Sequence, residues 1–437
     1  MVASNLSHRG ALASDSSASE NQVWDVCASL WDPTANPDGY VSLGVAENAL
    51  MHKELANFFN SQQLVDQKSF TYGDGPSGSK PARNAIAKFM NTYFKSLKSL
   101  DANQIVVTNG LSSVLEHASW ALTNPGDGIL LGRPYYRSFI SDLTLRTGAR
   151  IVPVAFQSTD PFSREAVGLY EKALLLSQNS GVKVKALLLC HPHNPLGRCY
   201  PEETIVELME LCQKYQIHLI SDEIYAMSVW GQHVTDPSLD TDTVPFESVL
   251  SIDTDDIIDP SLVHVLWGLS KDFGANGLRL GALISQSNPN FLAAVRTCGI
   301  YSSPSSLAET ATVRMLTDNA FVETYIKDSQ KLLAESYMFA VNLLRKYDIE
   351  FKPGASAAFF LWANLGRTYL EKHPEAKEKA KRQGITEVVF QELMGRKVFV
   401  VSGDAAGAEE PGWYRLVFSE PRDIVEEGIK RIAEALT

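Results

Sequence analysis

A lysine and an arginine lie eight residues apart in a glycine-rich stretch of the sequence. Lys271 follows the apolar run Val263–Trp267 and is flanked by Gly268 and Gly274, and Arg279 follows Gly277. A lysine at the end of a buried strand can have its pKa lowered and act as an amine nucleophile. The guanidinium of Arg279 is suited to bind an anion through paired hydrogen bonds. The alternative for Lys271 is a solvated surface lysine.

A carboxylate stands at a comparable place, because Asp222 directly follows the apolar run Ile217–Ser221. Burying an unpaired carboxylate there costs on the order of several kcal/mol of folding free energy. The cost falls when a cation pairs with the carboxylate. A pyridinium nitrogen or an arginine would serve as that cation. The alternative is that Asp222 caps the next helix.

Two further apolar runs end in polar turns. Residues 104–108 lead into Asn109, Gly110, Leu111, Ser112 and an apolar helical pattern, so free N–H groups and the positive end of a helix dipole could meet a phosphate there. The alternative is ordinary helix capping by the serines.

Residues 185–190 lead into HPHNPLGR (191–198), where Asn194 can present its amide to a ring oxygen. Asn-Pro and Leu-Gly are also common turn formers, which is the alternative for this segment. The two histidines, His191 and His193, are interpreted as loop residues, because no third ligand lies nearby. No metal site is therefore predicted.

These four apolar runs predict the architecture that positions the polar residues. Near-continuous apolar strands are typical of a parallel sheet covered on both faces. Residues 201–215 predict a helix between two of the strands, with Pro201 at its start, so the order is that of an α/β domain. In such sheets ligands bind beyond the carboxyl ends of the strands, where all these polar residues fall.

The last third of the sequence predicts a second, smaller α+β domain. Residues 321–346 predict a helix, residues 356–364 and 413–418 predict strands, and a helix around Val425–Ile432 closes the chain. We expect a disordered Ser/Ala-rich tail (1–20), a segment packing with the small domain (21–70), a large domain (71–318) and a small C-terminal domain (319–437).

Composition narrows the functional classes. The 437 residues carry 39 Lys+Arg and 51 Asp+Glu, a formal net charge of -12, which argues against general binding to nucleic acid or to a membrane surface. The five cysteines are odd in number and widely spaced, so a disulfide framework is not expected. With no membrane-spanning apolar run or signal core, a cytoplasmic protein is predicted.

Seven segments together resemble the fold-type I pyridoxal phosphate (PLP) enzymes of the class I/II aminotransferase group. They resemble most the 1-aminocyclopropane-1-carboxylate (ACC) synthases and their fungal ACC-synthase-like relatives. The segments are GVAENAL (44–50), KPARNAIAKFM (80–90), RPYYRSF (133–139), HPHNPLG (191–197), SDEIYA (221–226), LSKDFGANGLRLG (269–281) and WYRLVF (413–418). The resemblance implies the fold-type I fold, with a mostly parallel sheet in the large domain, and PLP as the cofactor.

The resemblance also implies roles around the PLP ring. Lys271 would form the Schiff base with PLP and later move the Cα proton. Asp222 would pair with the pyridinium nitrogen, so that the ring acts as an electron sink. Asn194 and Tyr225 would bond the phenolic oxygen, and Tyr136 would stack on the ring.

The remaining implied roles concern the phosphate and the substrate. Leu111, Ser112 and Arg279 would hold the phosphate, with Ser270 as a further candidate. Arg415 would bind the substrate α-carboxylate, and Glu47 would lie near the substrate amine. In a homodimer with shared active sites, Tyr72 would reach the phosphate in the partner subunit.

The sequence departs from the family at three places. Gly268 stands where relatives usually carry a serine three residues before the lysine, and His191 replaces an asparagine. Pro76 occupies the position, two residues before Gly78, where ACC synthases have a tyrosine that reaches the partner's site. This last change disfavours cyclisation of S-adenosylmethionine.

Several functions stay open. The leading hypothesis is a PLP-dependent lyase that cleaves the carbon–sulfur bond of a cysteine conjugate, as fungal ACC-synthase-like β-lyases of secondary metabolism do. The alternatives are an aminotransferase, an ACC synthase and a non-catalytic relative that keeps the fold. The expected partner is a small amino-acid substrate.

Overall fold

The computed structural model describes residues 5–239 and 244–437, which divide into two compact units. The first unit comprises residues 1–46, 336–352 and 361–437, of which 1–4 are not described, and the second comprises 47–335 and 353–360 without 240–243. The long helix α11 (Asn319–Lys346) contributes residues to both units, whereas the sequence predicts a boundary at 318/319.

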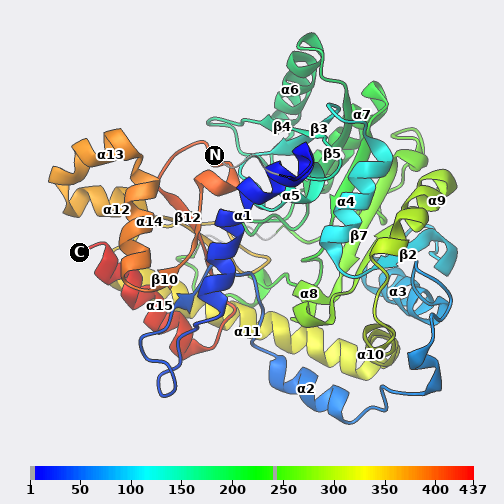
Figure 1. Cartoon of the computed structure of the whole chain (residues 1–437), viewed down its shortest axis with the longest axis horizontal. Coiled ribbons are helices and arrows are strands. Elements are labelled where there is room, and N and C mark those ends of the chain that lie inside the picture. Colours follow the sequence, from blue (N-terminus) through cyan, green and yellow to red (C-terminus); the bar gives the residue numbers. More distant parts are fainter. Residues whose placement is uncertain (1–4, 240–243) are drawn as a thin grey trace. The chain divides into compact units, whose positions relative to one another are not determined.

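The second unit is built on a sheet of seven strands within its described residues (Figure 1). In spatial order the strands are β2 (Ile105–Thr108), β8 (Gly281–Ile284), β7 (Val263–Gly268), β6 (His218–Asp222), β5 (Val184–Cys190), β3 (Gly128–Gly132) and β4 (Arg150–Val154). Only β8 runs antiparallel to its neighbours. The predicted α/β class with a mostly parallel sheet is therefore confirmed.

The sequence predicts four of these strands and misses β3, β4 and β8. The predicted runs 104–108, 185–190, 217–221 and 263–267 agree with β2, β5, β6 and β7 to within one residue. β8 has four residues and follows a glycine-rich turn, so its short apolar run gives little periodicity to detect.

Helices cover both faces of the sheet in this unit. Besides part of α11, the α-helices of its described residues are α2 (His52–Asn60), α3 (Lys80–Tyr93), α4 (Leu111–Leu122), α5 (Phe139–Thr144), α6 (Val167–Asn179), α7 (Glu202–Tyr215), α8 (Leu269–Asp272), α9 (Pro289–Cys298) and α10 (Ser306–Thr317). Residues of α4, α5 and α9 form one buried core with the sheet, in which Leu266 of β7 takes part. The next residue, Trp267, points to the opposite face and stacks on Phe89 of α3 with ring centroids 4.7 Å apart.

The helix predicted at 201–215 is α7, with Pro201 as its N-cap residue. Glu202 and Glu203 lie in its first turn and Lys214 in its last, which suits the helix dipole. Its chain then turns through Gln216, which has a left-handed backbone (φ 51°), into β6.

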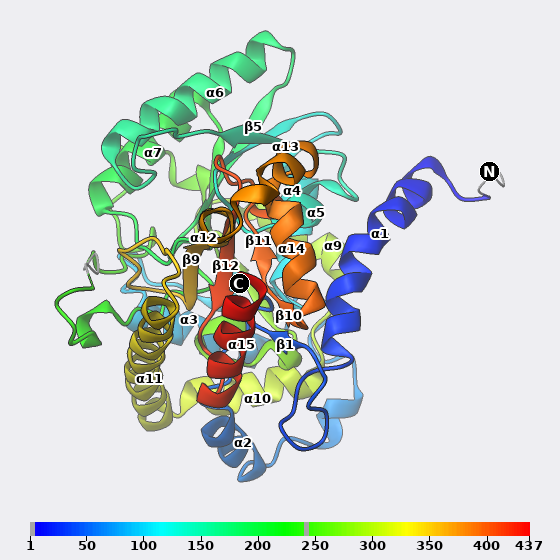
Figure 2. The same ribbon diagram turned by 90° about the vertical axis from the view of Figure 1, so that its left-hand side faces the viewer.

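The first unit contains the remaining elements, including a three-stranded sheet in the order β11-β12-β9. The elements are α1 (His8–Cys27), β1 (Val41–Ser42), β9 (Phe360–Asn364), α12 (Leu365–Lys372), α13 (Lys377–Gln383), α14 (Ile385–Gly395), β10 (Val398–Phe399), β11 (Val401–Ser402), β12 (Trp413–Val417) and α15 (Arg422–Ala435). β1 pairs in parallel with β10, and Figure 2 shows α14 (orange) and α15 (red) beside these strands.

Two segments differ from the sequence-based expectation. Helix α1 covers most of the expected disordered tail, beginning where the Ser7 side chain accepts a hydrogen bond from Gly10 N; residues 1–4 of that tail lie outside the described residues. The strand expected at 356–364 is wrong in its first part, because Ala358 has a left-handed backbone (φ 53°) and β9 starts at Phe360.

Among the described residues, the structure has no helix with the length and apolar character needed to cross a bilayer.

Candidate functional site

The four strands with polar ends finish at one edge of the sheet in the second unit. Cys190 is paired with Asp222, and Asp222 with Leu266, across β5, β6 and β7. On the other side of β7, Gly281 is paired with both Gly268 and Thr108. The residues that follow these positions therefore lie side by side, as expected for ligand binding at the carboxyl ends of strands.

Asp222 is the buried carboxylate at the centre of this edge. Burial raises the pKa of Asp222 to about 7, and the negative charge of Asp142 adds to this rise. A hydrogen bond from Ile224 N (3.3 Å) and the positive charge of Lys271 both oppose the rise. A carboxylate in such surroundings gains stability when a cation approaches it. No helix directly follows Asp222, because Ile224 belongs to a turn, so Asp222 does not cap a helix.

Lys271 lies in α8, immediately after β7, and its side chain is half-buried. The neighbouring Ser270 is buried. A Cβ placed on Gly268 would lie 2.6 Å from Leu280 O, so the start of α8 packs too closely for a side chain there. This contact accounts for the glycine that departs from the family pattern.

The start of α4 forms a close-packed turn with Arg279. Gly110 has φ +120°, no side chain caps the helix, and a Cβ on Gly110 would lie 2.3 Å from Arg279 Nη2. The guanidinium therefore lies directly over the backbone that leads into Leu111 and Ser112. Together the first N–H groups of α4 and the guanidinium offer donors for an anion.

Backbone packing fixes this turn from the other side as well. A Cβ on Gly281 would lie 2.7 Å from Leu111 N, and Arg279 Nη1 donates to Asn276 O at 3.1 Å. Asn276 Nδ2 donates in turn to Glu47 Oε1 at 3.3 Å, which brings the exposed Glu47 to the same turn.

Asn194 and Tyr225 are both buried in the loops that follow β5 and β6. The Tyr225 ring makes edge-to-face contacts with Phe359 (5.2 Å) and Phe360 (5.5 Å). His191 accepts a hydrogen bond from Tyr200 N at Nδ1 (3.2 Å) and lies 3.0 Å from Glu247 O through Nε2. The backbone thus occupies both ring nitrogens of His191.

The two aromatic residues predicted to contact PLP, Tyr136 and Tyr72, are less buried than Asn194 and Tyr225. Tyr136 is half-buried and packs edge-to-face on Phe139 of α5, with centroids 5.3 Å apart. Tyr72 is 101% exposed, so the structure of the single chain does not bring it together with the buried residues.

Arg415 belongs to the first unit, on β12. It is buried, it is paired with Val401 of β11, and its Nη2 donates to Gly44 O at 2.6 Å. These contacts hold the guanidinium in a defined orientation within that unit.

The sequence analysis gives no role to two buried carboxylates beside the predicted residues. Asp272 follows Lys271, and Glu223 follows Asp222. Acidic residues are usually exposed, and only their place next to chemistry-bearing residues could have drawn attention to them.

Glu223 fixes the loop before Val249. Its carboxylate accepts hydrogen bonds from Ser221 Oγ (2.9 Å), Ser248 Oγ (2.5 Å) and Val249 N (3.0 Å). Burial raises the pKa of Glu223 to about 7, although these hydrogen bonds oppose the rise.

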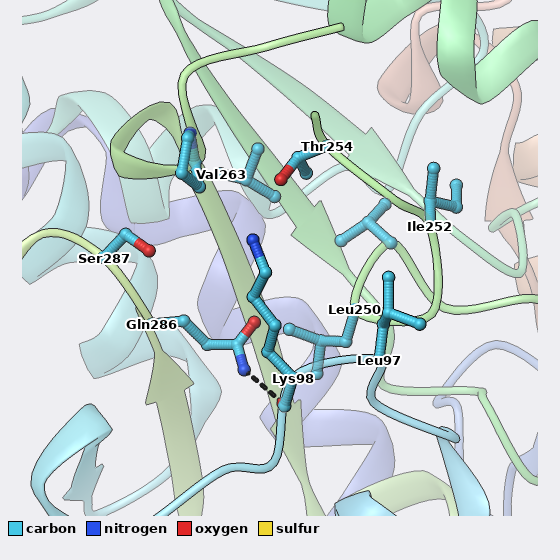
Figure 3. A pocket seen from close by; sticks show the side chains of 10 residues that line it. Leu97, Lys98, Leu250, Ile252, Thr254, Val263, Gln286 and Ser287 are labelled. Atoms are coloured by element: carbon cyan, nitrogen blue, oxygen red, sulfur yellow. Dashed lines mark hydrogen bonds between the residues drawn. The ribbon is translucent and has the colours of Figure 1, made fainter. Parts of the chain in front are cut away.

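A small cavity lies at the opposite edge of the same sheet, near the start of β7 and the end of β8 (Figure 3). Its volume is about 30 Å³, and Gln286 Nε2 donates to Lys98 O at its side (2.7 Å). A space of this size holds about one water molecule, so it has no room for an organic cofactor.

Comparison with known proteins shows similarity over nearly the whole chain. Residues 40–432 match the family described as aminotransferase class I and II. The probable aminotransferase tcpI of Claviceps purpurea is 34% identical over 91% of the chain and 89% of its own length. The ACC synthase 6 of rice (Oryza sativa subsp. japonica) is 29% identical over 95% of the chain and 76% of its own length.

Solved structures show a similar fold. The aspartate aminotransferase of Thermus thermophilus, solved with maleate, has a TM-score of 0.72 and 20% identity, covering 99% of this chain and all (100%) of the other. The architecture described above is therefore the fold of that enzyme group.

Replacement of Glu223 tests the electrostatic description of this edge. Because folding raises the pKa of Glu223 from 4.5 to about 7, its contribution to stability is complete below pH 4.5 and is lost as the pH rises through 7. In the PLP-free protein, Glu223→Gln should reduce the fall in unfolding free energy between pH 5 and pH 8 by roughly 3 kcal/mol, measured by urea unfolding.

The half-buried Glu171, which pairs with Lys214 at 2.6 Å, provides the control. Glu171→Gln should leave the fall nearly unchanged. An equal fall in wild type and Glu223→Gln would contradict the raised pKa.

Proposed function

The chain belongs to the class I and II aminotransferase family, and from that premise we propose that it is a PLP-dependent lyase that cleaves the carbon–sulfur bond of a cysteine conjugate. Enzymes of this family use PLP, and this chain is a PLP-dependent enzyme. Our proposal concerns the roles of individual residues around PLP and the type of reaction. The observation that carries it is the grouping of Asp222, Lys271 and the Gly110–Arg279 turn at one sheet edge.

The residues at this edge fit PLP. A cofactor with a phosphate and a pyridine nitrogen needs an anion cradle and a buried carboxylate. Arg279 over Gly110, with the N–H groups of Leu111 and Ser112, matches the first need. Asp222, with its raised pKa, matches the second.

Each residue has a distinct task in the proposed mechanism. When bound, PLP supplies an electron sink for the electron pair left at the substrate Cα. Asp222 would hold the ring nitrogen in its protonated form, and Lys271 Nζ would hold PLP and move the Cα proton. Asn194 and Tyr225 Oη would donate hydrogen bonds to the phenolic oxygen.

The remaining residues orient the cofactor and the substrate. Tyr136 would stack on the ring, and Ser270 would add a hydroxyl for the phosphate. Arg415 would bind the α-carboxylate, for which a guanidinium is well suited, and Glu47 would interact with the substrate amine.

Pro76 favours carbon–sulfur cleavage over ring formation. It stands two residues before Gly78, which has φ +90° and whose Cβ would lie 2.6 Å from Val107 Cβ. The end of the loop is thus fixed on β2, and Pro76 has no hydroxyl to offer where ACC synthases have a tyrosine.

Transamination is the second candidate, because relatives carry that name. Besides tcpI, the probable aminotransferase sirI of Leptosphaeria maculans is 32% identical over 92% of this chain and 93% of its own length. With PLP bound, the same residues would then support amino-group transfer in place of thiol release.

The cytoplasmic location expected from the sequence also remains part of this proposal.

A substrate assay separates the two candidates. The PLP-loaded protein, given a cysteine S-conjugate without any 2-oxo acid, should form thiol, pyruvate and ammonia over many turnovers. Lys271→Ala should lower that rate at least about 10³-fold, since the proton-transfer group is lost. A single equivalent of product, with turnover restored only by a 2-oxo acid, would identify an aminotransferase and contradict the lyase.

The phosphate cradle gives a binding test. Gly110→Ala forces a methyl group into Arg279 and a side chain into a left-handed backbone, so PLP affinity should fall at least about 10-fold. Gly277→Ala on the neighbouring turn is the control, because its Cβ would meet nothing within 4 Å. Equal PLP affinity in both variants, measured by absorbance titration, would rule out the assignment.

The proposal includes a homodimer in which Tyr72 reaches the partner subunit's phosphate. Large exposed apolar side chains in two segments, together called the patch, support it: Phe70, Tyr72, Ile300 and Tyr301 are 81%, 101%, 67% and 78% exposed. Their segments adjoin, because a Cβ on Gly299 would lie 3.2 Å from Pro76 O. Exposed apolar patches of this kind mark protein interfaces.

Light scattering tests the dimer. Wild type should have twice the mass of one chain, and Tyr301→Glu should shift it to one chain by placing a charge in the interface. Leu176→Glu on α6, at an exposed site outside the patch, should leave the dimer intact. A monomeric wild type would contradict the shared active site.

A further inference from the structure

Asp272 is a buried carboxylate surrounded by hydrogen-bond donors. Its Oδ2 accepts from Trp267 Nε1 at 2.9 Å, and its Oδ1 accepts from Ser228 Oγ at 2.8 Å. The nearby backbone N–H groups of Met227 and Ser228 also favour its ionised form and lower its pKa. Two side-chain hydrogen bonds and two backbone dipoles thus converge on one side chain that the proposed mechanism does not use.

The donors come from two segments of the active site. Trp267 lies on β7 before α8, and Met227 and Ser228 belong to the turn that begins after Asp222. The same turn contains Tyr225, whose carbonyl oxygen accepts from Ser228 N at 2.9 Å. Asp272 therefore joins α8, the helix of Lys271, to the turn that follows Asp222 and contains Tyr225.

The surroundings require a carboxylate and not its amide. The indole N–H of Trp267 and the nearby backbone N–H groups of Met227 and Ser228 cannot reverse their direction, and an asparagine has only one acceptor oxygen. The Trp267 ring is fully buried and stacks on Phe89, so it has no room to turn away. An amide NH₂ at position 272 would face one of these donors.

The hydrogen bonds to Asp272 partly offset the free-energy cost of burying its carboxylate. Burial raises the pKa of Asp272 to about 7, while the hydrogen bonds from Trp267 and Ser228 favour the ionised form. Removing part of this network leaves buried donors unsatisfied, which a native structure usually avoids by a shift of the backbone. That shift would move α8, the helix that bears Lys271.

We propose that Asp272 is a positioning residue, which holds the amine of Lys271 in line with Asp222 and Tyr225 by locking α8 to the turn after β6. The inference rests on the proposed role of Lys271 as the PLP lysine. Asp272 acts through the backbone and through Trp267, so we expect it to affect the rate of the chemical step more than cofactor or substrate binding.

The test compares Asp272→Asn with the control Glu223→Gln. The control removes a second buried carboxylate from the same edge, but the hydroxyl partners of Glu223, Ser221 and Ser248, can reverse their hydrogen bonds. Asp272→Asn should bind one PLP per chain, lower kcat about 10- to 100-fold and leave KM within about threefold. Its visible circular dichroism, which reports how the protein holds the ring, should fall by at least half. Glu223→Gln should keep the wild-type kcat and visible dichroism.

Trp267→Phe covers the case in which Asp272→Asn does not fold, because it removes one donor and leaves the carboxylate and its hydrogen bond from Ser228 Oγ in place. It should show the same changes to a smaller degree. Wild-type kcat and dichroism in the folded variants, or equal losses in Glu223→Gln, would overturn the role of Asp272. A wild-type protein without visible PLP absorption would overturn the proposed function and, with it, this inference.

Discussion

The site depends on a buried carboxylate at the end of a strand. Asp222 is paired in register with both neighbouring strands, so its backbone cannot move away from the sheet edge. Burial raises its pKa to about 7, and the turn after β6 offers it one main-chain donor, Ile224 N. Such a group is stabilised by a cation at this edge, a role that a protonated pyridine ring would fill. The strand order β6-β7-β8-β2 places the strand ends next to Lys271 and to the Gly110–Arg279 turn on one side of Asp222.

Close packing of the backbone at three glycines positions the turns around Lys271 and Arg279. Gly110, Gly268 and Gly281 lie where a Cβ would come within 3 Å of the guanidinium or the neighbouring backbone. Their absence of side chains lets the start of α4, the end of β7 and the start of β8 pack closely. The glycine at 268, a departure from the family pattern, is thus a requirement of this backbone. A serine there would need the turn before β8 to move.

The sequence predicted the α/β class, the family and the four strands whose ends carry polar residues, since near-continuous apolar runs and ordered motifs are strong local signals. It did not show that Asp272 and Glu223 are buried, because burial of a charged residue depends on donors far away in the chain, such as Ser228 and Ser248. It also missed the strands β3, β4 and β8 and extended the strand of β9 too far, since the left-handed Ala358 leaves no pattern in the residue types.

The proposed mechanism depends most on Lys271 being the residue that holds PLP covalently. Reduction of the PLP-loaded protein with borohydride, followed by peptide mass spectrometry, tests this directly. The proposed role of Lys271 requires one pyridoxyl group per chain on the peptide that contains Lys271, and none in Lys271→Ala. A label on another lysine, or no label on a protein that nevertheless absorbs as a PLP enzyme, would contradict it.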